Sequence, residues 1–104
     1  MPEELEEKLD INEFRAWLTE KGNEHVGFTV SEYADPIGNF FHEQHAMLAV
    51  ITDTDIVVPT DIHIPHKPWS KRFVSLLRNE YAGHDWVSGR DALSILDRAE
   101  KGGK

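Results

Sequence analysis

Apolar side chains in this chain recur at helical spacing in four segments, whereas β-branched residues gather only in a short central stretch. The clearest helical segment begins at Pro68, and its large apolar residues fall at i, i+4, i+7, i+8 and i+12. This spacing places them on one face of a helix. The residues are Trp69, Phe73, Leu76, Leu77 and Tyr81. The pattern predicts a fold in which helices outweigh strands.

Residues that start and stop helices bound the four segments. Asp10 and Ser88 suit helix N-caps, and each is followed three positions later by an acidic residue that completes a capping box. Asp35 precedes a proline, which is favoured at the first position of a helix. The predicted helices are 10–21, 35–45, 68 to a stop at Gly83, and 88–99, with Gly22 ending the first.

The β-branched stretch predicts a hairpin. Residues 47–52 and 56–58 are separated by the polar turn residues Asp53, Thr54 and Asp55. The apolar run 47–51 does not alternate with polar residues, so we expect both of its faces to be covered. Shorter strands are predicted at 26–30 and 60–64, the second kept short by flanking prolines.

These elements define an α+β fold, with about four helices packed on a small two- or three-stranded antiparallel sheet built around the central hairpin. The 104 residues suit one domain. We expect that domain to span 10–100, preceded by an acidic extension or first helical turn at 1–9 and followed by a tail at 101–104.

Several classes of protein are disfavoured by composition. The chain has no cysteine, which excludes thiol catalysis, disulfides and thiolate metal sites. Its longest apolar run, 47–51, is far shorter than the roughly twenty residues that cross a bilayer. The first residues also lack the pattern of a secretion signal. We therefore expect a cytoplasmic protein with no membrane contact.

Charge is divided unevenly along the chain. Residues 1–61 carry fourteen acidic and three basic residues, a difference of −11. Residues 62–104 carry five acidic and eight basic residues, a difference of +3, which gives the whole chain its formal charge of −8. A surface of one sign steers association with a partner of the opposite sign. Direct binding to a nucleic-acid backbone is not expected of a chain this acidic.

The acidic half therefore predicts a non-enzymatic interaction domain whose partner is another protein, with no cofactor. Carboxylates spread over one face can imitate the phosphates of a duplex, so an inhibitor or DNA mimic directed at a nucleic-acid-handling enzyme is the sharpest form of this hypothesis. In composition the chain resembles small, acidic, cysteine-free viral proteins that disarm bacterial defences. The partner-binding candidates on the acidic side are Glu20, Glu24, Glu32 and Asp35.

A cluster of basic residues has two readings. Lys67, Lys71, Arg72 and Arg78 fall in or beside the helix predicted from Pro68, away from its apolar face. They either form the solvated side of an amphipathic helix or make a contact patch for an acidic partner. The candidates for such a patch are Lys71, Arg72 and Arg78, and helices with faces of opposite charge leave the oligomeric state open.

Histidines supply the alternative function, a metal-binding or metal-dependent protein. Four of the six form two H-x-x-H pairs, His42 with His45 and His63 with His66. Two histidines at i, i+3 on a helix can reach one metal ion, which suits only the first pair. The competing reading is that His45 packs at the edge of the core while the others are solvated.

Sequence motifs for catalysis are weak. The serines lie in no G-x-S-x-G elbow, and the glycines form no phosphate-binding loop. An enzyme is therefore not predicted.

Overall fold

Residues 7–28, 35–52, 54–59, 61–80 and 86–101 are described by the computed structural model of the chain. Within these ranges the helices that the sequence predicts are all present, together with five short strands. The helices are α2 (Ile11–Lys21), α3 (Pro36–His45), α4 (Pro68–Glu80) and α5 (Gly89–Glu100). The predicted α+β fold of about four helices and a small antiparallel sheet is confirmed.

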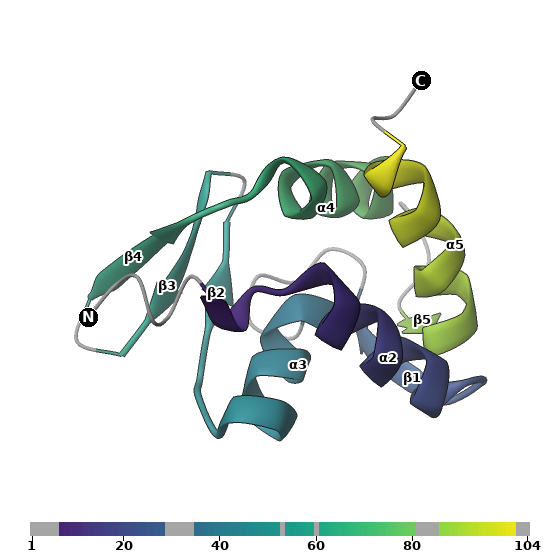
Figure 1. The fold of residues 1–104 in the computed structure, drawn as a ribbon, viewed down its shortest axis with the longest axis horizontal. Coiled ribbons are helices and arrows are strands. Elements are labelled where there is room, and N and C mark those ends of the chain that lie inside the picture. The colour runs from purple at the N-terminus through teal and green to yellow at the C-terminus, as the bar shows by residue number, and fades with distance from the viewer. Residues whose placement is uncertain (1–6, 29–34, 53, 60, 81–85, 102–104) are drawn as a thin grey trace.

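The strands form two separate antiparallel sheets at opposite ends of the molecule (Figure 1). One sheet is a meander of β2 (Val50–Ile51), β3 (Asp55–Val58) and β4 (Ile62–Pro65), which contains the predicted hairpin. The other pairs β1 (His25–Phe28) with β5 (Trp86–Ser88). Strand β5 was not predicted from the sequence. It has only three residues, and the last of them, Ser88, is also the N-cap of α5, so the segment gives no strand signal.

The helix caps form where the sequence places them. The carboxylate of Asp10 accepts the backbone N–H of Asn12 at 3.0 Å, and the hydroxyl of Ser88 accepts that of Asp91 at 3.1 Å. These bonds satisfy backbone donors that the first turn of a helix leaves without partners. At the end of α2, Gly22 adopts a φ of +58°, a backbone conformation that favours glycine.

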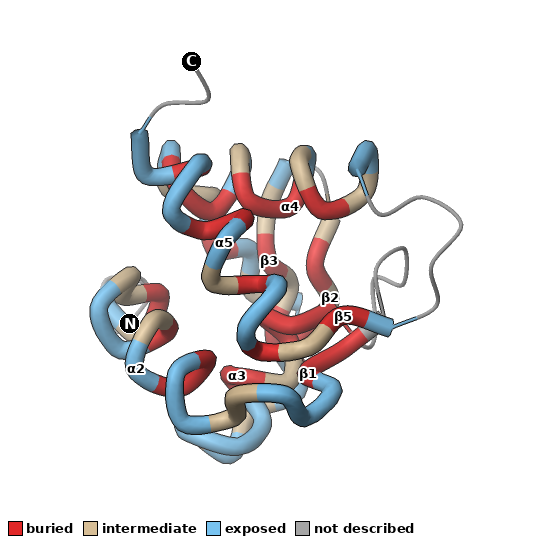
Figure 2. Tube along the Cα trace, turned by 90° about the vertical axis from the view of Figure 1, so that its right-hand side faces the viewer, coloured by how far each residue is buried: buried red, intermediate tan, exposed pale blue. Residues whose placement is uncertain are grey.

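Aromatic rings from three helices form the centre of the core. The ring of Phe14 on α2 is fully buried. Its centroid lies 5.3 Å from that of Phe40 on α3, and 5.7 and 5.2 Å from those of Trp69 and Phe73 on α4. Such contacts add about 0.5–1.5 kcal/mol per pair to the gain from burial. Figure 2 shows buried and exposed stretches alternating along the helices, so each turns one face to this core.

The three-stranded sheet closes one end of the core. Its register aligns Ile51, Ile56 and Ile64 in one row across the strands, and all three side chains are fully buried. Residues on the opposite face, including Val57 and His63, are half-buried or exposed. The sheet therefore persists because one face is covered by the helices.

The chain near the N-terminus contributes to the core as well. Leu9 lies in the predicted extension 1–9, and its side chain is fully buried in the main hydrophobic cluster. Residues 1–6 and 102–104 lie outside the described ranges. None of the helices in the described parts of the chain is both long and apolar enough to span a bilayer.

Candidate functional site

Carboxylates gather on the surface formed by α2 and α3. Lys21, at the end of α2, lies among three of them, because Glu43, Glu24 and Glu20 all interact with its ammonium group. The Lys21 Nζ donates to Glu43 Oε1 at 2.7 Å, and this bond is the main cause of the raised pKa of Lys21. The exposed fraction of the Glu43 side chain is 45%, so the lysine covers only part of the negative charge.

A hollow of about 360 Å³ lies between the two helices on the same surface. Glu13 and Glu20, seven residues apart on α2, both line it, and His45 of α3 lies 3.4 Å from Glu13. The buried side chain of Trp17 also lines the hollow, and its Nε1–H donates to Glu43 Oε1 at 3.4 Å. We call this surface, comprising Glu13, Glu20, Glu24 and Glu43 with Lys21 among them, the acidic α2–α3 face.

Three acidic residues on α4 and α5 are paired with arginines. Arg15, on the other side of α2, forms ion pairs with Asp97 and Glu100 of α5. Arg98 of α5 forms an ion pair with Glu80 of α4. The exterior is therefore mixed in charge around α4 and α5 and predominantly negative on the acidic α2–α3 face.

The four acidic candidates from the sequence have different environments. Glu20 and Glu24 are exposed and belong to the acidic α2–α3 face. Glu32 lies outside the described residues. The expectation that Asp35 lies on the surface is wrong, because its side chain is fully buried. Sequence alone indicated the helix cap but not the depth at which that cap would lie.

Asp35 caps α3 from inside the protein. Its Oδ1 accepts the backbone N–H of Ile37 at 2.8 Å, whereas Oδ2 is buried without a hydrogen-bond partner among the described residues. Loss of solvent raises the pKa of Asp35 to about 7, opposed by the bond from Ile37 and the charge of Arg78. This carboxyl group is thus a buried structural element at the start of α3.

The basic candidates on α4 mostly hold the fold together. Arg72 Nε donates to the backbone oxygen of Ala99 at 2.6 Å, which caps the end of α5. Arg78 donates to the backbone oxygen of Ile51 on β2 at 2.9 Å. Both arginines are half-buried, and only Lys71 of the three predicted contact residues is exposed. Arg72 and Arg78 therefore join α4 to other elements, and of the three only Lys71 matches the solvated side of an amphipathic helix.

The histidines of the two H-x-x-H pairs do not converge. His42 is exposed on α3, and His45 lies beside Glu13. His63, on β4, is bracketed by Asp55 Oδ2 at 2.6 Å and Asp61 Oδ1 at 3.3 Å. The bond with Asp55 is the main cause of the raised pKa of His63.

His66 is fixed by neutral partners. Its Nδ1 lies 2.8 Å from the hydroxyl of Ser70, and its Nε2 lies 2.8 Å from the backbone oxygen of Thr52. Burial lowers the pKa of His66. Ser70 is fully buried and also bonds the backbone of Lys67, so its hydroxyl secures the first turn of α4. Across the described ranges, no group of three or more histidine or acidic residues is arranged to hold a metal ion.

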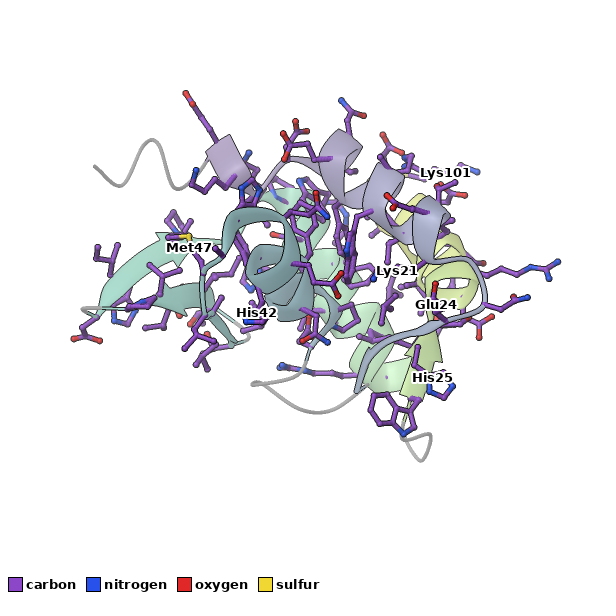
Figure 3. The ribbon with its side chains drawn as sticks, turned by 90° about the horizontal axis from the view of Figure 1, so that it is seen from below. Lys21, Glu24, His25, His42, Met47 and Lys101 are labelled. Atoms are coloured by element: carbon purple, nitrogen blue, oxygen red, sulfur yellow. The ribbon has the colours of Figure 1, made fainter. Side chains whose placement is uncertain are left out.

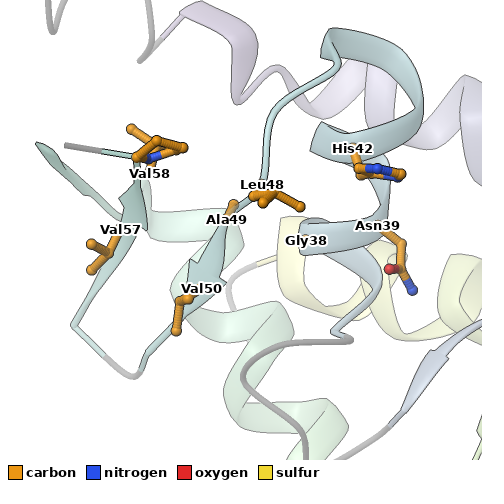
Figure 4. A pocket seen from close by; sticks show the side chains of 9 residues that line it. Gly38, Asn39, His42, Leu48, Ala49, Val50, Val57 and Val58 are labelled. Carbon is orange, nitrogen blue, oxygen red and sulfur yellow. The ribbon is translucent and has the colours of Figure 1, made fainter. Parts of the chain in front are cut away.

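An apolar groove was not predicted from the sequence. It has a volume of about 570 Å³ and lies between α3 and the β2–β3 hairpin (Figure 4). The run 47–51 was expected to be covered on both faces, but the exposed fraction of Leu48 is 69%. The missing alternation in this run indicated burial on both faces, so the sequence contains no signal of an exposed groove. Its lining consists of Gly38, Asn39, His42, Leu48, Ala49, Val50, Val57, Val58 and Pro59.

Figure 3 views the molecule from the side on which α3 is exposed, with His42 and Lys21 both visible. His42 lines the apolar groove, and Lys21 belongs to the acidic α2–α3 face. No known protein family, curated protein or solved structure matches the chain. The assignment of function therefore rests on the geometry and charge of the acidic α2–α3 face.

Proposed function

We propose that the protein is a non-enzymatic interaction domain that binds a basic surface of another protein through the acidic α2–α3 face. The observation that carries this proposal is the contrast between the two sides of the molecule. Glu80, Asp97 and Glu100 are paired with arginines. Among the described residues, Glu20 and Glu24 form no ion pair within 4.0 Å, although both interact with Lys21 over longer distances.

Electrostatics explains why this contrast favours binding. A group of exposed carboxylates attracts a basic surface over about a Debye length, roughly 10 Å at 0.1 M salt. The attraction increases the association rate and disfavours partners that are themselves acidic. Carboxylates already held by arginines contribute less, because much of their charge is neutralised locally. The acidic α2–α3 face is therefore the side that a basic partner would meet.

The sharper form of the proposal is an inhibitor that mimics nucleic acid. Proteins that handle nucleic acids carry basic clefts that bind phosphates. An acidic face on a chain of formal charge −8 suits such a cleft, and the same charge disfavours direct binding to nucleic acid. In this form, the partner of the acidic α2–α3 face is a nucleic-acid-handling enzyme, and occupation of its cleft inhibits it.

Affinity capture with charge variants tests the proposal. The baits are the wild-type protein, Glu20→Gln/Glu24→Gln, and Glu80→Gln/Glu100→Gln, each exposed to lysate of the cells that encode the protein. Both double variants remove two negative charges, the first on the acidic α2–α3 face and the second from carboxylates that are paired with Arg98 and Arg15. We expect a basic protein, identified by mass spectrometry, to be retained by the wild type and the Glu80/Glu100 variant. The Glu20/Glu24 variant should retain about threefold to tenfold less.

Competition with nucleic acid decides between the broad and the sharper form of the proposal. If the captured protein binds nucleic acid, duplex DNA or RNA should displace it from the wild-type bait, as competition for one cleft requires. Equal retention by all three baits would contradict the role of the acidic α2–α3 face. Retention of a partner that nucleic acid does not displace would exclude mimicry but leave the acidic interface in place.

A further inference from the structure

The apolar groove adjoins the acidic α2–α3 face. His42 of α3 lines the groove, and it also interacts electrostatically with Glu43, the next residue along the helix. The pKa of Glu43 is lowered mainly by its hydrogen bond from Lys21, with a smaller contribution from His42. One exposed side of α3 therefore borders carboxylates toward α2 and apolar side chains toward the hairpin (Figures 3 and 4).

The groove has the size and lining of a binding site. Its volume of about 570 Å³ lies within the roughly 300–1,000 Å³ typical of ligand pockets. The lining is mostly apolar, with polar side chains only from Asn39 and His42. Asn39 is committed to the fold, because its Nδ2 donates to the backbone oxygen of Val26 at 2.7 Å. Leu48, with 69% of its surface exposed, lies at the edge of the groove.

We propose that this groove receives a large apolar side chain from a basic segment of the partner, whose lysines or arginines meet the acidic α2–α3 face. The inference rests on the proposed function and specifies the chemistry of the partner segment. Protein interfaces commonly combine an apolar centre with a charged rim, and a few buried anchors supply most of the binding energy. Here the groove is the apolar centre and the carboxylates form one side of the rim.

Charge complementarity selects this occupant over a second copy of the chain. A symmetric dimer formed through this surface would bring the same patch of both subunits together. Glu20, Glu24 and Glu43 would then lie close to their own copies, which is electrostatically unfavourable. A partner segment with positive charge beside its apolar anchor has no such penalty.

Peptide selection tests the inference. Random twelve-residue peptides displayed on phage are selected on the immobilised wild-type protein at low salt. We expect the enriched peptides to share lysines or arginines and one large apolar residue. Synthetic copies of the best peptide are then titrated by fluorescence anisotropy. Replacing the apolar residue of the peptide with alanine, or introducing Leu48→Ala in the protein, should weaken binding about tenfold.

Matched variants separate this inference from the proposed function. Trp86→Ala removes another exposed large apolar side chain, which stacks on His25 with ring centroids 5.1 Å apart, and should leave affinity unchanged. If Glu20→Gln/Glu24→Gln weakens binding but Leu48→Ala does not, the groove inference fails and the acidic interface stands. If Leu48→Ala weakens binding but neither salt nor the charge variant does, the groove binds an apolar ligand and the proposed function fails. Failure to enrich basic peptides overturns both.

Circular dichroism of Leu48→Ala completes the test. The side chain is mostly exposed, so its truncation should leave the melting temperature nearly unchanged. Weaker peptide binding by a folded variant then reports on the groove itself. Weaker binding accompanied by unfolding would be resolved with Leu48→Asn, which keeps the length and branching of the side chain while making it polar. Full affinity of that variant would overturn the inference.

Discussion

Gly89→Ala is expected to destabilise the protein by about 3 kcal/mol, near the upper end of the usual cost of overpacking. A Cβ atom at Gly89 would lie 2.5 Å from the backbone oxygen of Leu18 and 2.9 Å from the Cβ atom of Lys21. The first contact is with backbone, which cannot rotate away as a side chain can. The start of α5 would therefore have to move away from the end of α2.

That movement would disturb hydrogen bonds as well as packing. The backbone N–H of Gly89 donates to the oxygen of Glu24 at 3.0 Å, and that of Arg90 donates to the oxygen of Gly22 at 2.8 Å. Both bonds join α5 to the segment between α2 and β1. Their distortion leaves backbone groups with weaker partners, which adds to the steric cost.

Thermal unfolding measures the effect. For a domain of this size, the expected loss lowers the melting temperature by roughly 10–20 °C. Arg90→Ala is the control, because Arg90 is exposed on the next position of α5 and its replacement should change the melting temperature little. A Gly89→Ala protein as stable as the wild type would show that α2 and α5 do not approach as closely as described.

Asp35→Asn is expected to remove a large pH dependence of stability. Burial raises the folded-state pKa of Asp35 from 3.8 to about 7. Between these values the folded protein keeps a proton that the unfolded chain releases. Wild-type stability from this group is therefore fully present below about pH 4, falls as the pH rises, and is lost above about pH 7. The difference of about three pKa units corresponds to about 4 kcal/mol.

Chemical denaturation at several pH values measures this dependence. Asparagine caps helices about as well as aspartate but does not titrate. The stability of Asp35→Asn relative to the wild type should therefore rise by about 4 kcal/mol between pH 4 and pH 8. Subtracting the unfolding free energy of the wild type from that of the variant at each pH removes the contribution of titratable groups that both proteins share.

Asp10→Asn provides the matched control. Asp10 caps α2 through the same type of bond, to the backbone N–H two residues later, but its side chain is only half-buried. Its replacement measures what an aspartate-to-asparagine change at a helix cap does by itself. A constant difference between Asp35→Asn and the wild type from pH 4 to pH 8 would show that Asp35 does not retain a proton in the folded state.

Local sequence signals were sufficient for the helices. Asp10, Asp35 and Ser88 all cap helices as predicted, because capping depends on a side chain and its nearest backbone neighbours. The hairpin was predicted for a similar reason, since β3 follows β2 after a short polar turn. The pairing of β1 with β5 was missed because it joins residues about sixty positions apart in sequence, and no local pattern encodes such a contact.

The candidate site was predicted less completely than the fold. Glu20 lies on the polar side of α2, and Glu24 lies just after the end of this helix, so both are expected to be exposed. The burial of Asp35 depends on packing between segments distant in sequence, and so do the bonds of Arg72 and Arg78 to other elements. Charge counts alone cannot distinguish an arginine that holds two elements together from one that is available to a partner.

The apolar groove depends on tertiary structure in the same way. Its walls come from α3 and from both strands of the hairpin, so no single segment of sequence contains it. Leu48 was read as part of a run covered on both faces, because a short apolar run does not show which of its residues will lack a neighbour.

Salt dependence of partner affinity tests the acidic interface most directly. Binding of the captured protein is measured for the wild type and both double charge variants, from about 50 mM to about 500 mM NaCl. We expect the affinities of the wild type and of Glu80→Gln/Glu100→Gln to fall steeply and in parallel. Glu20→Gln/Glu24→Gln should bind more weakly, with a shallower dependence of affinity on salt. Affinities that are independent of salt, or equal slopes for the two double variants, would contradict binding through the acidic α2–α3 face.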